Sequence, residues 1–538
     1  MVPIVILAVL LAAQTGFAQQ IDAAAIDKVF ARYTEPNTPG CVLGVGRDGK
    51  VLYSRGYGMA NLEYDAPLTA ESIEEIGSVS KQFTAAAVLL LANRGVLSLE
   101  DDVRKWVPEL HDFGDKITIR MLANHTSGLR DQWGLLSLMN SPPGTAIHNP
   151  DQLLDLLARQ RELNFKPNDE YLYSNSGYTL LGIIVKRASG KSLAEFSKEN
   201  IFEPLGMTHT QWRDDFTRIV KGRATAYSRN ATGYRQEMPF TNAYGNGGLL
   251  TTVADLITWW DALYNDKLGK GFLAQLTTTG VLNNRHALTY ALGVTVGEYR
   301  GAKEISHSGA TAGYRAYLAS FPSSRTTIAV LCSNASANTN AHIHAVADLV
   351  LATELKAEPA NTAQIKAADS VDLNRFVGLY LQPATGETQR MQLRNGKLAI
   401  ADIELVATGP NSLVETRGVA TMEATDRNGA LELRVKQRNE APFTIVKVAE
   451  VKPSESQLQE YTGSYTSPEL GVNYRISASN GNLVVKRHLQ SDLTLVPAYQ
   501  DAFSNFGSWV FTRDAGGKVN GVLYTQGRVR RVRFVKDS

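Results

Sequence analysis

The spacing of apolar residues divides the chain into strand-like runs, a helical middle and a second strand-like region. Residues 41–59, CVLGVGRDGKVLYSRGYGM, form two β-rich runs joined by Asp-Gly, which predicts a β-hairpin. Residues 81–95, KQFTAAAVLLLANRG, are rich in Ala and Leu and end in glycine, which predicts a helix. We expect two further helices at 178–189 and 252–264, after which strand-like runs return at 315–333.

Strand-like runs at both ends of this first unit, with helices between them, predict an α/β domain. The simplest closure is one antiparallel sheet, built from the two ends, with the helices packed against it. We place this domain at 19–357 and a polar, alanine-rich linker at 358–370. The remaining residues, 371–538, show short alternating runs separated by turn residues, which predicts an all-β region with copies at about 371–450 and 456–538.

The all-β region repeats itself. LNRFVGLY begins at Leu373 and LQEYTGSY at Leu458, 85 positions later, and NGKLAI at Asn395 and NGNLVV at Asn480 keep this offset. Two anchors at one offset indicate an internal duplication. We expect about four strands in each copy, so that the two copies together close one barrel of about eight strands without exposed edges. The terminal GRVRRVRFVKDS predicts a strand whose arginines face water on the barrel surface, in preference to an anion-binding site.

The first residues predict a leader for export. Residues 4–13 are wholly apolar, too short a run to span a bilayer, and Gly16 and Ala18 favour cleavage after Ala18. We therefore expect a signal peptide at 1–18, a periplasmic or secreted protein, and no stable membrane span after cleavage. The alternative is a short membrane anchor or a buried helix, because no Lys or Arg precedes Lys28.

Composition and cysteine content narrow the function classes further. The 538 residues carry a net charge of +2, from 55 basic and 53 acidic side chains, so nucleic acid is not the expected partner. Cys41 and Cys332 lie in strand-like runs and make no disulfide framework, so we expect two buried thiols rather than a bridge. Gly44, Gly46 and Gly49 have the spacing G-x-G-x-x-G, but a strand follows them instead of the helix that a dinucleotide site requires.

One short motif offers nucleophilic chemistry. Ser78 and Lys81 are three residues apart at the start of the first strong helix, so their side chains share a face. A serine hydroxyl becomes a nucleophile when a base takes its proton, and a desolvated lysine can be that base. Ser80, adjacent to Lys81, lacks this geometry. Taken alone, the motif is weak and favours an ordinary capped helix with an exposed lysine.

Two distant motifs change this interpretation. Residues 173–175 read Tyr-Ser-Asn and residues 307–309 read His-Ser-Gly. With Ser-x-x-Lys, this order resembles the serine β-lactamase and penicillin-binding-protein superfamily, in its class C-like branch with esterases and D-aminopeptidases. The stretches MLANHTSGL, IFEPLGMTHT and GNGGLLTTVADL are also similar to that branch. The resemblance covers about residues 24–350.

The resemblance implies an acyl-enzyme mechanism. Ser78 would attack a carbonyl, and Lys81 and Tyr173 would share the proton transfers, with the acylation base left open between them. Asn175 would hydrogen-bond the substrate or Lys81. Because a cation favours a neighbouring anion, Lys81 is expected to favour the anionic form of Tyr173. Water would then hydrolyse the acyl-enzyme.

The third motif forms the wall of the expected site. His307 is expected on the strand beside the nucleophile, with Ser308 and Gly309 as substrate wall. The backbone N–H groups of Ser78 and Ala310 would form the oxyanion hole. Typical β-lactamases carry lysine where this chain has His307, and a neutral histidine cannot supply that fixed charge. Efficient β-lactam hydrolysis is therefore not expected, and the resemblance places histidine at this position often among the esterase and peptidase members.

These inferences define three functional alternatives. The first is an exported serine hydrolase that cleaves a small-molecule or peptide substrate at an amide, peptide or ester bond. The others are a receptor that is acylated, or binds a ligand, without turnover, and a true β-lactamase. No metal or cofactor is expected, and His342 and His344 are interpreted as packing or surface residues. The all-β region resembles the lipocalin-like barrels that some relatives carry beside the site.

Overall fold

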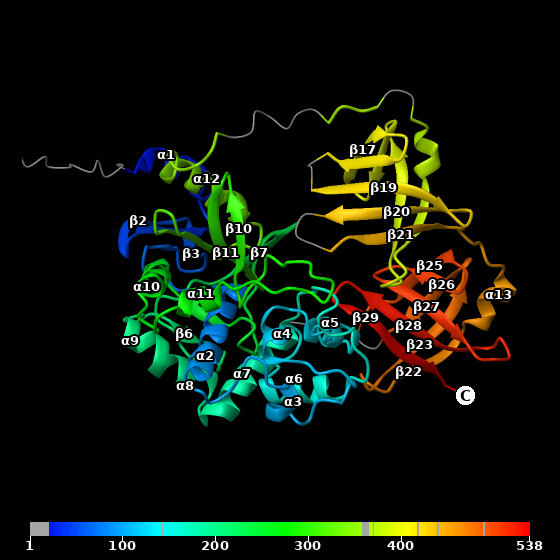
Figure 1. Ribbon diagram of the computed structural model, residues 1–538, viewed down its shortest axis with the longest axis horizontal. Coiled ribbons are helices and arrows are strands. Elements are labelled where there is room, and N and C mark those ends of the chain that lie inside the picture. The colour runs from blue at the N-terminus through cyan, green and yellow to red at the C-terminus, as the bar shows by residue number, and fades with distance from the viewer. Residues whose placement is uncertain are drawn as a thin grey trace, which may run out of the picture.

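The computed structural model describes residues 21–142, 144–357, 365–368, 371–416, 419–437, 441–487 and 490–537. It contains an α/β unit followed by two β-barrels, the first in yellow and the second in orange and red (Figure 1). The leader expected at 1–18 and most of the linker expected at 358–370 lie outside the described residues. Among the described residues, no helix is both long enough and apolar enough to cross a membrane.

The central sheet of the α/β unit has the strand order β10-β11-β12-β13-β1-β2, and neighbouring strands are antiparallel. Strands from the two ends of the unit meet where β1 pairs with β13, which confirms the predicted closure. The predicted hairpin turns at Asp48 and Gly49, whose φ angles of 49° and 73° suit a two-residue turn. The six strands are β1 (Cys41–Arg47), β2 (Lys50–Tyr57), β10 (Thr295–Tyr299), β11 (Ala302–Thr311), β12 (Tyr314–Phe321) and β13 (Thr326–Cys332).

The three predicted helices are present. Helix α2 (Lys81–Asn93) is buried along most of its length and packs against α7 (Asn175–Ser189). Glycines in the left-handed conformation follow both helices, Gly95 at φ 71° and Gly190 at φ 76°. The third predicted helix is α10 (Val253–Tyr264).

Shorter helices and three small sheets surround this framework. The other helices of the unit are α1 (Ala23–Val29), α3 (Val103–Trp106), α4 (Ile119–Ala123), α5 (Gln132–Leu138), α6 (Pro150–Ala158), α8 (Leu193–Ser197), α9 (Glu203–Leu205), α11 (Phe272–Leu276) and α12 (Thr339–Val350). The small sheets comprise β3 (Met59–Asn61), β4 (Ala66–Pro67), β5 (Glu74–Glu75), β6 (Gln211–Trp212), β7 (Tyr227–Asn230), β8 (Gly233–Gln236) and β9 (Leu249–Thr251).

Helices cover both faces of the central sheet. Successive residues of a strand point to opposite faces, and Val42 joins the core that contains α10, whereas Leu43 joins the core that contains α12. The glycine-rich β1 is needed for the first of these contacts. A Cβ on Gly44 would lie 2.6 Å from Val253 Cβ, and one on Gly46 would lie 2.3 Å from Ile257 Cγ2. These glycines therefore let α10 approach the sheet closely.

The prediction of two separate thiols is wrong, because Cys41 and Cys332 form a disulfide. Cys41 is the first residue of β1 and Cys332 the last of β13, and the antiparallel register places them directly opposite each other. Their Cα atoms are 3.9 Å apart and both residues are fully buried. The composition of the two runs correctly predicted that both cysteines are buried in strands. Whether they form a disulfide depended on the pairing of β1 with β13, which the sequence did not show.

The all-β region forms two closed barrels instead of the single barrel expected from both copies. Each copy supplies eight strands rather than about four, so each closes by itself and removes its own edges. The first barrel comprises β14 (Gly378–Leu381), β15 (Thr388–Arg394), β16 (Lys397–Ile400), β17 (Ile403–Gly409), β18 (Ser412–Glu415), β19 (Ala420–Arg427), β20 (Ala430–Gln437) and β21 (Phe443–Val448). The second comprises β22 (Gly463–Ser467), β23 (Val472–Ser479), β24 (Asn482–Lys486), β25 (Leu493–Tyr499), β26 (Ala502–Ser504), β27 (Ser508–Arg513), β28 (Val519–Gln526) and β29 (Val529–Lys536).

The two barrels share side-chain interactions at the sequence offset of 85 residues. Tyr380 Oη donates to the Phe376 carbonyl at 3.0 Å, and Tyr465 Oη donates to the Tyr461 carbonyl at 2.8 Å. All four residues are buried. The same tyrosine thus closes the start of each barrel onto the turn before it, as a duplication of one ancestral unit would produce.

The second barrel docks on the α/β unit through an arginine whose side chain is fully buried. Arg130 Nη1 donates to Glu469 Oε2 at 2.6 Å, while its Nε and Nη2 donate to the carbonyls of Arg530 and Arg531. Figure 1 shows β29 running toward α5 of the α/β unit. The expectation that the terminal arginines all face water is wrong: Arg530 is buried, and Arg528 enters a cavity described below.

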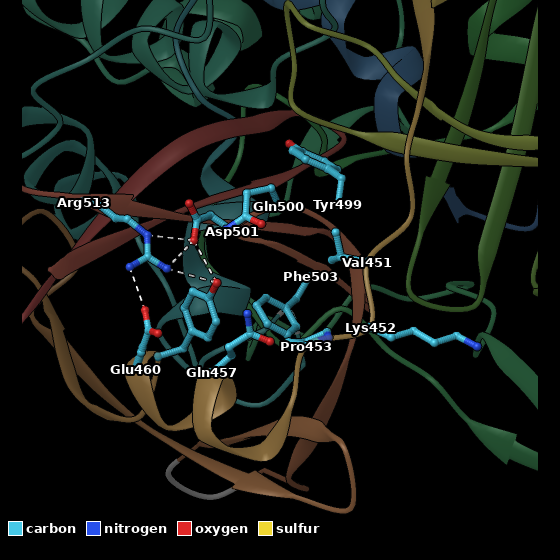
Figure 2. A pocket seen from close by; sticks show the side chains of 11 residues that line it. Val451, Lys452, Pro453, Gln457, Glu460, Tyr499, Gln500, Asp501, Phe503 and Arg513 are labelled. Atoms are coloured by element: carbon cyan, nitrogen blue, oxygen red, sulfur yellow. Dashed lines mark hydrogen bonds and ion pairs between the residues drawn. The ribbon is translucent and has the colours of Figure 1, made fainter. Parts of the chain in front are cut away.

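A separate cavity of about 360 Å³ lies on the second barrel beside α13 (Glu455–Glu460) (Figure 2). Three of its charged groups, Glu460, Asp501 and Arg513, pair with one another. Arg513 donates to Asp501 Oδ1 at 2.7 Å and to Glu460 Oε2 at 2.8 Å, and Tyr461 Oη also donates to Asp501. This network holds α13 against the barrel. The cluster of charged side chains therefore has a structural role.

We expect the double variant Cys41→Ala/Cys332→Ala to unfold more easily than the wild type. The bridge joins residues 291 apart, and removing such a cross-link lowers the free energy of unfolding by about 2–5 kcal/mol. Urea-induced unfolding followed by tryptophan fluorescence would measure the change. Reductant should move the wild-type transition toward that of the variant. Identical transitions for oxidised wild type and variant would contradict the assignment of a stabilising bridge.

Candidate active site

Ser78 and the other candidate residues surround one large cavity. Ser78 lines this cavity of about 930 Å³ and lies on a 3-10 turn, η2 (Gly77–Ser80), that leads directly into α2. Its side chain is partly exposed, whereas Ser80 is fully buried and its Oγ accepts a hydrogen bond from Leu249 N at 3.1 Å. The fold therefore presents Ser78, rather than Ser80, to a bound molecule.

Lys81 is fully buried beside Ser78. Its Nζ donates to Ser78 Oγ at 3.1 Å and to Asn175 Oδ1 at 3.0 Å, and it also donates to the Asn246 carbonyl. Burial lowers the pKa of Lys81 well below the usual lysine value, since desolvation disfavours the ammonium form. The two carbonyl oxygens can only accept. A neutral amine would therefore donate to both of them and direct its lone pair to the Ser78 hydroxyl, which can donate.

Asp131 holds Asn175 in the orientation that Lys81 requires. Its Oδ2 accepts from the backbone N of Asn175 at 2.7 Å and from Asn175 Nδ2 at 2.8 Å. The amide nitrogen is thereby turned away from Lys81 and Oδ1 toward it. Asp131 also partly opposes the lowering of the Lys81 pKa, because a nearby anion favours the ammonium form.

The ring of Tyr173 lies close to both the buried amine and a cation from the second barrel. Lys81 Nζ is 4.9 Å, and Arg528 Cζ 4.5 Å, from the centroid of its ring. Burial raises the pKa of Tyr173 further above its ordinary value, although Ser78 and Arg528 partly oppose the shift. The expectation that Lys81 favours a Tyr173 anion is therefore wrong, because desolvation disfavours charge on both groups.

His307 stands on β11 and lines the cavity as a neutral ring. Burial, with a smaller contribution from Lys81, lowers the pKa of His307 to about 4. Nδ1 lies 2.5 Å from the Ser308 carbonyl, which can only accept, so Nδ1 carries the proton. Nε2 then accepts from Tyr290 Oη at 2.8 Å. These two bonds select one tautomer and keep the ring uncharged near neutral pH.

Two glycines bring the proposed oxyanion donors together. Gly77 has φ 49°, and a Cβ on it would lie 2.6 Å from Ala310 N. A Cβ on Gly309 would lie 2.0 Å from the Ile76 carbonyl and 3.2 Å from Ser78 N. Glycine at both positions therefore lets β11 approach the serine turn, so that Ser78 and Ala310 line the same cavity.

Several groups of this site were missed by sequence reasoning: Asp131, Asn246, Tyr290 and Arg528. Asn246 lies within the family-like stretch GNGGLL, and Asp131 follows the family-like NHTSGL, so both had a local signal. Tyr290 and Arg528 had none, since their importance depends on contacts with residues far along the chain. The predicted wall residues Ser308 and Gly309 do line the cavity.

Three other histidines contact structural partners. His125 adopts φ 64°, its Nδ1 accepts from Ser174 N at 3.2 Å, and its ring centroid lies 4.2 Å from that of Tyr173. His342 Nε2 bonds Tyr33 Oη at 2.8 Å, and His344 stacks on a tyrosine. Within the described part of the chain, no three His, Cys, Asp or Glu side chains gather as metal ligands.

Known proteins resemble this chain over most of its length. The model of the beta-lactamase family matches residues 26–353. The chain is 31% identical to penicillin-binding protein 4* of Bacillus subtilis over 377 residues, which cover 64% of this chain and 81% of that protein. It is 28% identical to a D-aminopeptidase of Brucella anthropi over 521 residues, which cover 90% of this chain and 92% of that protein.

A solved structure has the same fold. The octameric penicillin-binding protein homologue from Pyrococcus abyssi aligns with a TM-score of 0.55 at 22% identity, covering 79% of this chain and 100% of that one. The family match extends over more than half of the sequence and confirms the resemblance that the motifs indicated. This chain therefore belongs to the beta-lactamase family, in the branch that contains penicillin-binding proteins and D-aminopeptidases.

Proposed function

We propose that the protein is an exported serine hydrolase that cleaves an amide, peptide or ester bond through an acyl-enzyme on Ser78. The observation that carries this proposal is the 3.1 Å contact between Ser78 Oγ and the fully buried Lys81 Nζ. A desolvated amine beside a partly exposed hydroxyl is a general base beside its nucleophile. Membership of a family with D-aminopeptidases and penicillin-binding proteins supports hydrolysis as the reaction.

Lys81 is the acylation base in this mechanism, because burial lowers the pKa of Lys81 and favours its neutral form, whereas burial raises the pKa of Tyr173 and favours the protonated phenol. Ser78 Oγ attacks the substrate carbonyl while its proton passes to Lys81 Nζ. The developing oxyanion accepts hydrogen bonds from the N–H groups of Ser78 and Ala310. Tyr173 then gives its phenolic proton to the leaving group, and the Lys81 ammonium returns a proton to Tyr173.

Deacylation repeats these transfers with water. Lys81 takes a proton from the attacking water, the ester bond to Ser78 Oγ breaks, and Oγ recovers a proton as the acid product leaves. His307 contributes a neutral wall rather than a fixed charge, because its pKa of about 4 leaves it uncharged at pH 7. This favours peptidase or esterase activity over efficient β-lactam hydrolysis. The names of the relatives suggest D-amino-acid amides and peptides as the first substrates to test.

Export and the division of the chain belong to the same proposal. The apolar residues 4–13 support a cleaved leader at 1–18, and the buried disulfide suits an oxidising compartment such as the periplasm. The last helix of the α/β unit and the first strand of the barrels support domains at 19–357 and 371–538, joined by a linker at 358–370.

We expect Ser78→Ala to lose turnover by about 10³–10⁶-fold, because no other group supplies the nucleophile. The substrates would be a p-nitrophenyl ester, a D-amino-acid anilide and a chromogenic cephalosporin. Ser80→Ala is the matched control and should retain activity, since its hydroxyl faces Leu249 rather than the cavity. Equal turnover by wild type and Ser78→Ala would refute the nucleophile. Stable acylation of the wild type without turnover, seen by mass spectrometry, would indicate the receptor instead.

We expect the kcat/KM of ester hydrolysis to rise with pH through an inflection well below the ordinary lysine pKa. Acid removes the base by protonating Lys81, and burial places this loss at lower pH than for an exposed lysine. The raised pKa of Tyr173 predicts no decline near pH 10 from phenol ionisation. A neutral ester over a wide pH range would give the profile. A single inflection near the ordinary lysine pKa would contradict a desolvated base.

A further inference from the structure

Residues 130–132, which we call the clamp segment, link the second barrel to the α/β unit. The buried Glu469, between β22 and β23, accepts a hydrogen bond from Arg130 Nη1 at 2.6 Å. Arg130 also donates to two backbone carbonyls of the barrel, and Asp131 N donates to a third at 3.2 Å. The acceptors are the carbonyls of Arg530, Arg531 and Arg528. The barrel therefore holds two consecutive residues of the clamp segment, one by its side chain and one by its backbone.

The same three residues hold the start of α7. Ser176 is fully buried, and its Oγ donates to the Arg130 carbonyl at 2.6 Å and accepts from Gln132 N at 2.8 Å. Asp131, between these two residues, accepts from the backbone and side-chain nitrogens of Asn175. The clamp segment thus makes four hydrogen bonds to the first two residues of α7, while the barrel makes four to the clamp segment.

The first residue of α7 is the one that contacts the buried amine. Asn175 Oδ1 accepts from Lys81 Nζ at 3.0 Å, and Lys81 Nζ lies 3.1 Å from Ser78 Oγ. Reacting groups tolerate little displacement, and a shift of about 1 Å caused by a distant change can cost about 100-fold in rate. A movement of the clamp segment would therefore reach the base and the nucleophile through a single intervening side chain.

The link between the barrel and the clamp segment depends on one buried charge. The Arg130 side chain is fully buried, and Glu469 is its close anionic partner, whereas Glu162 lies 3.8 Å away and is 45% exposed. A buried guanidinium that loses its partner is strongly destabilised unless water reaches it. Replacing Glu469 by glutamine keeps the shape of the side chain but removes the charge, so that water would enter between the barrel and the clamp segment.

We propose that Glu469 is a positioning residue of the second barrel, which orients Asn175 through the clamp segment. Asn175 in turn directs the Lys81 amine toward Ser78. This inference rests on the proposed hydrolase function and adds a regulation of its site, since the base is placed correctly only while the second barrel is docked. The alternative is that Glu469 contributes to docking alone and has no influence on the base.

The kinetic test uses Glu469→Gln in the full chain with p-nitrophenyl acetate as substrate. We expect kcat to fall by about 10–100-fold with little change in KM, because the variant displaces the base and leaves the residues that line the cavity in place. Glu469→Asp keeps the charge on a shorter side chain and should retain more activity than Glu469→Gln. Equal kcat values for wild type and both variants would overturn the proposal.

The matched control is Tyr474→Phe, which removes another buried bond of the same interface. Tyr474 Oη donates to the Leu138 carbonyl at 2.5 Å, outside the clamp segment. This variant should keep the wild-type kcat, and circular dichroism and thermal unfolding would show that each variant is folded. If Tyr474→Phe lowers kcat as much as Glu469→Gln does, the effect belongs to docking in general and the specific role of Glu469 is refuted.

The titration of Lys81 separates this inference from the proposed function, because it needs no turnover. It would be followed by NMR of ¹³C-labelled lysine in the Ser78→Ala variant, with Lys81→Arg to assign the signal. Glu469→Gln should raise the pKa of Lys81, since water admitted beside the clamp segment would favour the ammonium form, whereas Tyr474→Phe should leave it unchanged. The other charged and titratable groups near Lys81 are the same in all these proteins: Asp131, Tyr173, Tyr178, His125, His307 and Arg528.

The two measurements give distinct outcomes. An unchanged Lys81 titration in Glu469→Gln would overturn the positioning role even if hydrolysis through Ser78 is found. A raised Lys81 pKa in a protein without any turnover would support the positioning role and refute the hydrolase.

Discussion

The Lys81 amine is fully enclosed by protein and therefore loses its hydration. The properties of the surrounding site depend on this desolvation. Desolvation favours the neutral amine, which is the form that can accept a proton from Ser78. The Asn246 carbonyl and the Asn175 side-chain oxygen accept hydrogen bonds from Lys81 Nζ. A neutral amine has two N–H groups, so its lone pair is left to face the Ser78 hydroxyl. The same burial keeps Tyr173 protonated. In the proposed mechanism, burial therefore accounts for the base and the acid together.

The orientation of this amine depends on a pair of adjacent residues that also hold the second barrel. Asp131 fixes Asn175, while Arg130 donates to Glu469 and to two backbone carbonyls of the barrel. The Arg130 side chain is fully buried, and a buried charge that loses its partner costs about 3–5 kcal/mol. Displacing the barrel would therefore disturb the segment that orients the side-chain amide of Asn175. Residues 130 and 131 thus contact the second barrel and the proposed site from adjacent positions in the chain.

The duplicated barrels have different surroundings although their internal structure is shared. The tyrosine that closes each barrel and the eight-strand closure occur in both copies. The second copy contacts the α/β unit through the end of β29, and the first copy contacts the turn of the second through Glu387. Duplication thus supplied two stable barrels, and contacts with neighbouring parts gave one of them a place beside the cavity.

The sequence by itself determined the features that depend on nearby residues. Apolar periodicity and glycine stops placed three helices, Asp48-Gly49 placed a hairpin, and the 85-residue offset revealed the duplication. The order of three motifs was enough to indicate the family and to nominate Ser78 and Lys81. These signals are local, or are preserved as short patterns, so they can be recognised without coordinates.

The tertiary structure decided what depends on contacts between distant segments. Strand register joined Cys41 to Cys332, and barrel closure within each copy set the number of barrels at two. Burial lowered the pKa of Lys81 and raised that of Tyr173, because desolvation arises from the whole surrounding chain. The docking of the second barrel brought Arg528 to the cavity, whereas its alternating Arg-Val pattern had indicated a solvent-exposed strand. A side chain's neighbours across the fold, rather than its neighbours in sequence, determine its charge and its access to substrate.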